Sequence, residues 1–207
     1  MDKQNLILSY LNKLFAQPRC ELNFKNNFEL IVAVVLSAQC TDKRVNLVTP
    51  KLFEQYPTAK DLSKAKQKDV IAIIHSLGFY NNKSKNIINL SKDLCSRFNG
   101  EVPNNFDDLV SLSGVGRKTA NVVLAVAYSQ DAIAVDTHVF RVSNRLGIKS
   151  KNPLECELKL QKMFNKKDWS NLHYLLVLFG RYYCKAINPQ CETCKLQNIC
   201  EYYNKTK

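Results

Sequence analysis

The chain has 207 residues, and 45% of them are hydrophobic, so it can bury a core in one large or two small domains and is not intrinsically disordered. Its 30 Lys and Arg residues against 18 Asp and Glu residues give a net charge of +12. This charge favours a polyanionic partner such as nucleic acid, although a generally lysine-rich composition would give it too.

The longest apolar runs, 30–38 and 174–179, are too short to cross a bilayer. The first residues mix charges with apolar positions, unlike a signal peptide. We therefore expect a cytoplasmic protein with no membrane contact.

Apolar residues recur at helical spacing along the whole chain, and strand patterns are almost absent. The predicted fold is all-α, with about ten helices joined by short loops. In chain order, the predicted helices lie near 6–15, after a cap at Asn26, after Thr41, near 68–78, over 83–98, after Asn105, from Arg117, from Thr137, after Asn152 and after Asp168. Pro50 lies inside the third pattern, so we expect that helix to kink or split, with Thr49 as a new N-cap.

A glycine-rich turn, Ser113-Gly114-Val115-Gly116, joins a short predicted helix to the longer helix that begins at Arg117. Glycines suit the positive φ angles of a tight turn and let another molecule's backbone approach closely. Exposed N–H groups at the start of the second helix suit a phosphate. The residues alone leave two interpretations open: a DNA-binding helix-hairpin-helix, or a plain αα-hairpin whose glycines only cap helices.

Lys118 stands in the first turn of that longer helix. The positive end of the helix dipole and the neighbouring Arg117 both disfavour its charged form there. An uncharged amine is the nucleophilic form of lysine. Because Lys118 lies off the centre of the helix's apolar stripe, it can face a cleft. On these residues alone, a phosphate-binding lysine is an equally good interpretation.

Asp136 ends an apolar run where a new helical pattern begins at Thr137. Simple helix capping explains an aspartate at this position. If the returning loop brought Asp136 toward Lys118, the amine and the carboxylate would form an acid–base pair.

Eight cysteines in a cytoplasmic chain are expected to be reduced. Four of them, Cys20, Cys40, Cys95 and Cys156, are scattered, and we interpret them as buried or unreactive thiols. The other four have the spacing C-x6-C-x2-C-x5-C and are Cys184, Cys191, Cys194 and Cys200. This spacing favours an iron–sulfur cluster but leaves a zinc site open. The three histidines lack metal-ligand spacing, and we interpret His138 as structural.

Together, "LSGVGRKTANVV", "VDTHVFR" and the cysteine cluster resemble the helix-hairpin-helix DNA glycosylases, most closely the endonuclease III family. "ELNFKNNFELIVAVVLSAQCTD" and "GFYNNKSKNI" are also similar to that family, so the likeness covers nearly the whole chain. The resemblance implies two all-α domains flanking a cleft: a six-helix barrel at 20–130, and a cluster domain made of 1–19 and 131–207. It further implies a monomeric base-excision repair enzyme that acts on double-stranded DNA with damaged or abasic nucleotides.

Carried over to this sequence, the resemblance makes Lys118 the nucleophile and Asp136 the catalytic carboxylate. The family removes oxidised pyrimidines after rotating the nucleotide out of the duplex, and then cleaves the abasic site by β-elimination through a lysine imine. Relatives that excise a base without cutting the strand generally lack this lysine. Its presence here favours the bifunctional class.

The resemblance also implies a set of DNA contacts: Gln39, Gly114, Val115, Gly116, Arg117, Thr119 and Lys185. Gln39 matches the residue that fills the gap left by a flipped nucleotide, although by itself it reads as an ordinary polar residue near a helix end. Cys40 stands where the family has a small alanine. Phe79 and Tyr80 are interpreted either as a stacking wedge or as core residues.

By the same resemblance, Cys184, Cys191, Cys194 and Cys200 hold a 4Fe-4S cluster, which would fold a tail too short to bury its own core. Lys185 is the single cation in a loop, 185–190, where the family typically has several, so we expect this loop to contribute weakly to DNA binding. Two alternatives stay open: a non-catalytic DNA-binding module, and a glycosylase of the same fold with another base preference.

Overall fold

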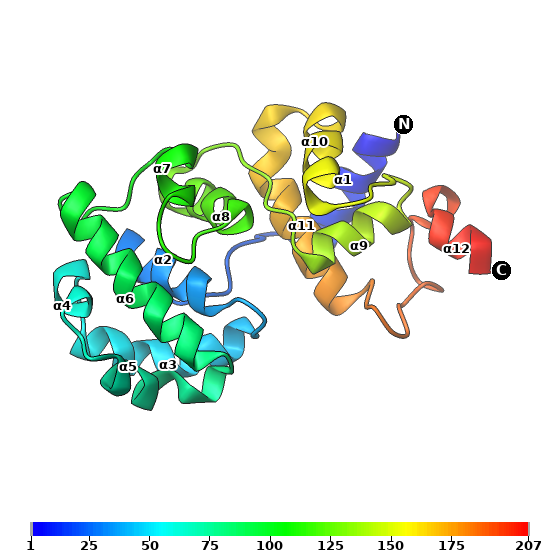
Figure 1. Ribbon diagram of the computed structural model, residues 1–207. Coiled ribbons are helices and arrows are strands. Elements are labelled where there is room, and N and C mark those ends of the chain that lie inside the picture. Colours follow the sequence, from blue (N-terminus) through cyan, green and yellow to red (C-terminus); the bar gives the residue numbers. More distant parts are fainter. Residues whose placement is uncertain (1, 207) are drawn as a thin grey trace. The chain divides into compact units, whose positions relative to one another are not determined.

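The computed structural model describes residues 2–206, which form helices and loops and no strand (Figure 1). The α-helices within these residues are α1 (Lys3–Leu14), α2 (Asn27–Leu36), α3 (Asp42–Gln55), α4 (Ala59–Ser63), α5 (Gln67–Ile74), α6 (Tyr80–Arg97), α7 (Phe106–Val110), α8 (Arg117–Tyr128), α9 (Thr137–Arg145), α10 (Pro153–Met163), α11 (Trp169–Tyr182) and α12 (Glu201–Thr206). Three short 3-10 helices are η1 (His75–Leu77), η2 (Lys166–Asp168) and η3 (Gln197–Ile199). The predicted all-α fold is confirmed. None of the described helices has both the length and the apolar character that crossing a bilayer requires.

The chain divides into two compact units. Residues 21–129, here called the hairpin unit, contain α2 to α8. Residues 1–20 and 130–207, here called the cysteine unit, contain α1 and α9 to α12 within their described part. Each unit has its own buried side chains, in agreement with a two-domain organisation.

The hairpin unit is built around α2, whose residues from Phe28 to Leu36 are all buried. The segment "NFELIVAVVL" is apolar on every side, and such a helix is stable only inside a core. It packs against α3, α6 and α8. Its start is a variant of the capping box: Asn26 Oδ1 accepts from the Glu29 N–H at 2.9 Å, and Glu29 Oε2 accepts at 2.7 Å from the N–H of Lys25, the residue before the N-cap.

The third helix corrects one prediction. α3 continues through Pro50 as a single helix, and Thr49 is buried inside it instead of capping a new helix. Val45 and Leu52, on either side of the proline, are fully buried against the core. Burial of such side chains stabilises by about 1.5–3 kcal/mol each, enough to offset the one hydrogen bond that Pro50 cannot make.

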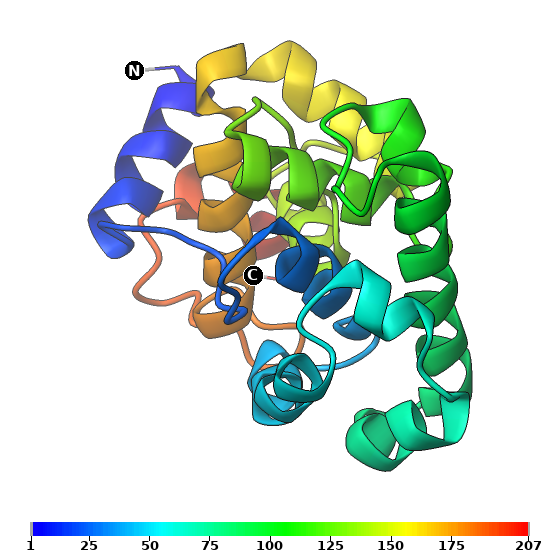
Figure 2. The same ribbon diagram turned by 90° about the vertical axis from the view of Figure 1, so that its left-hand side faces the viewer.

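Figure 2 shows α6 running along the hairpin unit from the side of α3 and α5 to the side of α7. The helix starts at Tyr80, three residues before the predicted start, because the segment after Gly78 turns directly into it. The helical patterns do not predict α4 and α12, which have only 5 and 6 residues. Helices this short show too few turns for a periodic pattern.

In the cysteine unit, α9 and α11 approach each other closely. A Cβ on Gly180 of α11 would lie 2.8 Å from His138 Cβ of α9, so only glycine fits at this crossing. The core around these helices consists mainly of Leu, Ile and Val side chains, including Ile7, Leu11, Val139, Val142, Leu172, Leu175 and Leu176. Asp168 precedes α11 as predicted, but its side chain makes no cap hydrogen bond because η2 already turns the chain into the helix.

Candidate functional site

The glycine turn predicted from the sequence joins α7 to α8, and its two glycines serve different purposes. Gly114 has φ 78°, and a Cβ there would lie 2.8 Å from Asn86 Cβ, so the fold itself requires glycine at this position. Gly116 has an ordinary φ of −96°, and a Cβ there would meet nothing within 4 Å. The chain's own packing therefore does not require glycine at position 116.

The turn is fastened to α6 by Asp93. The carboxylate oxygen Oδ2 accepts from the Ser113 N–H at 3.1 Å and from the Ser113 hydroxyl at 2.8 Å. Val115 is 6% exposed, and its N–H donates to Leu112 O at 3.1 Å. The turn is thus held rigidly, and Val115 supports it from inside, whereas Gly114 and Gly116 are exposed.

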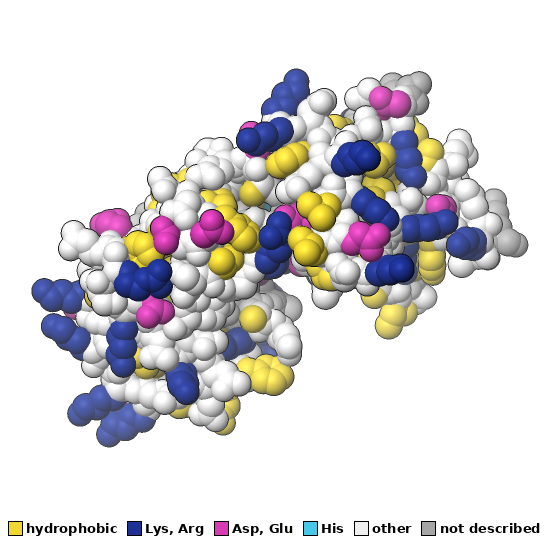
Figure 3. All heavy atoms as spheres, turned by 45° about the horizontal axis from the view of Figure 1, so that its top comes forward, with side chains coloured by type: hydrophobic (Ala, Val, Ile, Leu, Met, Phe, Trp, Pro, Cys, Tyr) yellow, Lys and Arg dark blue, Asp and Glu magenta, His cyan; other side chains and the backbone are white. Residues whose placement is uncertain are grey.

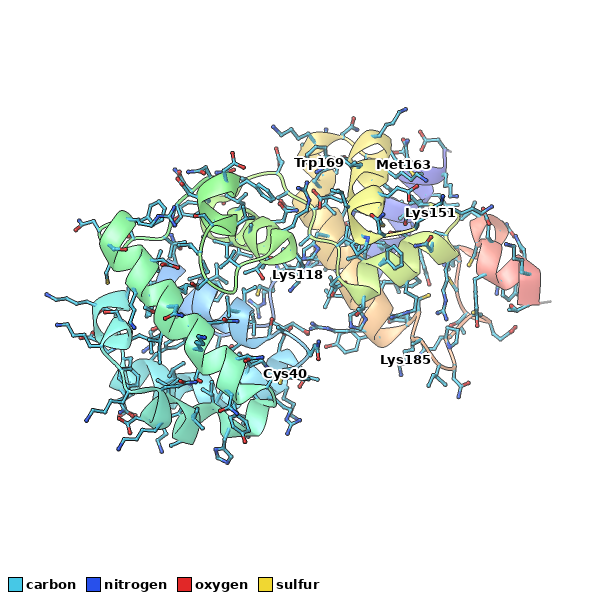
Figure 4. All side chains as sticks on the ribbon, viewed as in Figure 1. Cys40, Lys118, Lys151, Met163, Trp169 and Lys185 are labelled. Atoms are coloured by element: carbon cyan, nitrogen blue, oxygen red, sulfur yellow. The ribbon has the colours of Figure 1, made fainter. Side chains whose placement is uncertain are left out.

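Lys118 is the second residue of α8 and is half-buried (Figure 4). Thr119 next to it is also half-buried, and Ala120 begins the buried face that anchors the helix. Arg117 is exposed, with its guanidinium 4.9 Å from the centre of the Phe106 ring. The first turn of α8 therefore presents two cationic side chains beside an open glycine.

Asp136 is the N-cap of α9, as the sequence predicts. Its Oδ1 accepts from the Val139 N–H at 2.8 Å, and its side chain is half-buried. Asp136 belongs to the cysteine unit and Lys118 to the hairpin unit. Their pairing across a cleft stays a prediction.

Two side chains of α11 hold the extended segment that leads to Asp136. The Ser170 hydroxyl donates to Gln130 O at 3.0 Å, and the buried His173 has Nδ1 2.7 Å from Ala134 O. These residues are about 40 positions apart in the chain. Sequence reasoning missed both contacts, because no local pattern marks a side chain that supports a distant backbone.

Gln39 and Phe79 are among the exposed residues of the hairpin unit that lie in the left-handed region although they are not glycine. Gln39, after α2, has φ 53° and is exposed. Phe79, between η1 and α6, has φ 48° and is 64% exposed, and Tyr80 is 38% exposed. Phe79 is therefore not a core residue. Such backbone strain concentrates at binding sites and active sites.

The four clustered cysteines line one pocket of the cysteine unit, together with Arg145 and Tyr202. Burial is the main cause that raises the pKa values of Cys191 and Cys194, and repulsion from the neighbouring thiols adds to it. No carboxylate lines the pocket, so the ligands that it offers are soft sulfur atoms. Within residues 2–206, no three His, Cys, Asp or Glu side chains are arranged to hold a single metal ion. A thiolate-bound group fits this donor set.

Arg145 of α9 holds the loop that follows the first of these cysteines. Its Nη1 donates to Lys185 O at 2.7 Å and lies 3.4 Å from Cys184 Sγ, and its Nη2 donates to Ala186 O at 3.1 Å. Lys185 itself is exposed in this loop, after the end of α11 (Figure 4). No local sequence pattern indicates this role of Arg145.

The scattered cysteines form no disulfide within the described residues. Cys156 is buried, and burial raises the pKa of its thiol, as expected of an unreactive core residue. Cys40 is half-buried and lies beyond the end of α2 (Figure 4).

Comparison with known proteins agrees with the resemblance drawn from the motifs. Residues 32–166 match the family model described as HhH-GPD superfamily base excision DNA repair protein. Endonuclease III of Bacillus subtilis is 49% identical over 195 residues, which cover 93% of this chain and 89% of that protein. Endonuclease III of Rickettsia felis is 45% identical over 97% of this chain and 94% of its own length.

Two solved structures extend the likeness to three dimensions. A trapped endonuclease III–DNA covalent intermediate is 47% identical, with a TM-score of 0.94 over 100% of this chain and 99% of that one. A non-covalent endonuclease III–DNA complex is 46% identical, with a TM-score of 0.95 over the same shares. The chain therefore belongs to the HhH-GPD superfamily of base excision DNA repair proteins, and within it to the endonuclease III family.

Proposed function

We propose that the protein is a bifunctional base-excision repair enzyme that removes oxidised pyrimidines from duplex DNA and cleaves the strand at the resulting abasic site. The observation that carries this proposal is the position of Lys118: half-buried in the first turn of α8, directly after an exposed glycine turn. The related protein trapped as a covalent intermediate with DNA supports a nucleophilic role for this lysine.

The first reaction exchanges the base for the lysine. The nucleotide leaves the stack, because C1′ of its sugar cannot be reached inside a duplex. The uncharged amine of Lys118 attacks C1′, and its electron pair forms the new C1′–N bond. The bond from C1′ to the base breaks, and the base leaves with the electrons of that broken bond and takes up a proton. Asp136, as a carboxylate, stabilises the positive charge on the sugar and accepts one proton from the attached nitrogen.

The second reaction cuts the strand. The C1′–O4′ bond opens, the ring oxygen takes a proton, and C1′ is left as a protonated imine on Lys118. The imine makes the C2′ proton acidic. Loss of that proton supplies the electrons for a C2′–C3′ double bond and expels the 3′ phosphate. Water then hydrolyses the imine and restores the lysine.

The hairpin unit supplies the DNA-binding groups. The open space at Gly116 leaves room for a phosphate near the N–H groups at the start of α8, and Arg117 adds charge beside it. Gln39 and Phe79 are exposed side chains that would enter or stack on the bases at the lesion. On the face shown in Figure 3, Lys and Arg side chains are spread over both units, as a long polyanion requires. An enzyme of this kind would work at the nucleoid, in the cytoplasm.

The cysteine unit would hold a 4Fe-4S cluster through Cys184, Cys191, Cys194 and Cys200, the four thiols that line its pocket. When bound, the cluster would cross-link the segment 184–200 and so contribute to its folding. Arg145 would keep the loop after Cys184 in place.

Reductive trapping tests the proposal. Incubation with abasic duplex DNA and borohydride should reduce the imine to a stable protein–DNA adduct. Lys118→Ala should form none, whereas Lys64→Ala, which changes an exposed lysine of the same unit, should react like the parent. If the parent forms no adduct, the lyase proposal is wrong and a DNA-binding module remains. If Lys118→Ala still forms the adduct, the assignment of Lys118 as the nucleophile is wrong.

The choice of base needs a separate assay. Duplexes that each contain one oxidised pyrimidine, one mismatched thymine or one alkylated purine would be compared for base release. The proposal expects release of the oxidised pyrimidine to be fastest.

A further inference from the structure

Lys83, in the first turn of α6, is a buried cation with no acidic partner among residues 2–206. Its side chain is 4% exposed, and no carboxylate is among the groups that interact with its ammonium. Lysine is almost never fully buried unless it is paired, because an ammonium loses its hydration in the interior. Burial accordingly lowers the pKa of Lys83. Because a buried, unpaired ammonium destabilises the fold, its presence here points to a function that requires it.

The contacts of Lys83 bracket the loop that exposes Phe79. Its Nζ donates to Leu77 O at 3.1 Å, and its backbone N–H donates to Phe79 O at 3.0 Å. Between these two carbonyls, Gly78 has φ 67° and ψ 156°, a conformation essentially restricted to glycine, and Phe79 is left-handed. One residue thus fixes both sides of a strained turn.

The same ammonium also interacts electrostatically with the loop that contains Gln39. Cys40 and Arg44 are the charged or ionisable groups that act on it, and Cys40 directly follows the left-handed Gln39. Lys83 is thus hydrogen-bonded to the loop 77–80 and electrostatically coupled to the loop at Gln39, both of which contain a residue other than glycine with positive φ. Strain of this kind persists only where surrounding contacts determine it.

We propose that Lys83 is a positioning residue for lesion recognition: its buried ammonium holds the loop 77–80 in the strained form that presents Phe79 for stacking on the bases of damaged DNA. The inference rests on the proposed function, since it assumes that this face binds DNA. Lys83 itself does not touch the DNA. It acts by ordering the loop before DNA binds, so that binding loses less conformational entropy.

Lys83→Met is the main test, because methionine has a similar length and no donor. The variant should be at least as stable to urea as the parent, since a buried unpaired charge is removed. Its Kd for a duplex with a tetrahydrofuran abasic-site analogue should rise about tenfold, the effect of losing one stacked base, while its Kd for undamaged duplex stays the same. Lys85→Met, an exposed lysine on the same helix, is the matched control and should change neither.

Two further variants separate positioning from general structure. Lys83→Arg keeps a donor toward Leu77 O and should restore most of the preference for the abasic-site analogue. Phe79→Ala should already have lost the preference for the abasic-site analogue. In that background Lys83→Met should lower the preference almost no further, because both changes remove the same stacking interaction.

The inference is overturned if Lys83→Met keeps the parent's preference, if it loses stability and binds both duplexes equally weakly, or if its effect adds to that of Phe79→Ala. It is also overturned if Phe79→Ala binds the analogue as the parent does. Borohydride trapping through Lys118 is measured in parallel with all variants. Failure of the proposed function would therefore appear as the loss of trapping in the parent, independently of Lys83.

Discussion

The two glycines of the hairpin should respond in opposite ways to replacement by alanine. In Gly114→Ala, the new Cβ lies 2.8 Å from Asn86 Cβ, and alanine must adopt φ 78°. A left-handed conformation costs about 1–2 kcal/mol, and crowding costs about 1–3 kcal/mol. Restricting the unfolded chain regains about 0.4–1 kcal/mol. We expect the free energy of unfolding to fall by about 2–4 kcal/mol.

Gly116→Ala should leave stability nearly unchanged. The backbone angle suits alanine, and its Cβ enters open space. Alanine is a poorer N-cap than glycine, but it also restricts the unfolded chain, and the two effects oppose each other at about 1 kcal/mol or less each. DNA binding should weaken instead, because the methyl group occupies the space through which a phosphate reaches the N–H groups of α8. Loss of one or two such hydrogen bonds raises Kd about tenfold.

Urea unfolding followed by circular dichroism measures the first effect, and fluorescence anisotropy with undamaged duplex at one fixed salt concentration measures the second. The reasoning is refuted if Gly116→Ala loses as much stability as Gly114→Ala. It is equally refuted if Gly116→Ala binds duplex as tightly as the parent, because glycine at position 116 would then serve neither the fold nor DNA.

Three more outcomes follow from the structure. Burial lowers the pKa of Lys83 below its ordinary 10.5, with Cys40 and Arg44 as the neighbouring groups, so the unfolded chain binds more protons at this lysine than the folded chain. The stability that Lys83→Met gains over the parent should therefore be full at neutral pH and vanish as the pH rises toward 10.5. Melting curves of the two proteins over this pH range measure the difference. His173→Ala should slow single-turnover strand cleavage about tenfold with little change in Kd for DNA, since it releases Ala134 O two residues before Asp136; an equal loss of binding would contradict this role. Cys194→Ser should lower the iron content of the purified protein and expose the segment 184–200 to proteolysis, whereas Cys95→Ser should do neither.

Local signals in the sequence were enough for most helix boundaries. The caps at Asn26, Asn105 and Asn152 each accept the predicted backbone N–H, because a cap involves residues only three apart. The unbroken α3 could not be predicted in this way. Pro50 is unfavourable locally, and only the burial of the residues around it, set by other helices, keeps the helix whole.

In the candidate site, too, features set by nearby residues are predictable from the sequence, whereas contacts between distant positions are not. Lys118 at a helix start and Asp136 as an N-cap follow from nearby residues, and the structure shows both local settings. The support from His173 to Ala134 and from Arg145 to the loop at Lys185 joins positions about 40 apart, for which a single sequence has no periodic signal. The burial of Lys83 is hidden for another reason: a lysine in the first turn of a polar-looking helix reads as a solvated residue.

Backbone strain offers an independent way to find the site. Five non-glycine residues within 2–206 have positive φ: Gln39, Phe79, Asn99, Ser129 and Asn188. Asn99 follows the end of α6 and Ser129 ends α8, where a left-handed residue closes a helix, and asparagine tolerates this region well. Phe79 instead precedes a helix, and its large side chain is 64% exposed. In the proposed role, a partner that contacts the ring accounts for this strain, and the hydrogen bond from the Lys83 ammonium to Leu77 O keeps the ring in place before the partner binds.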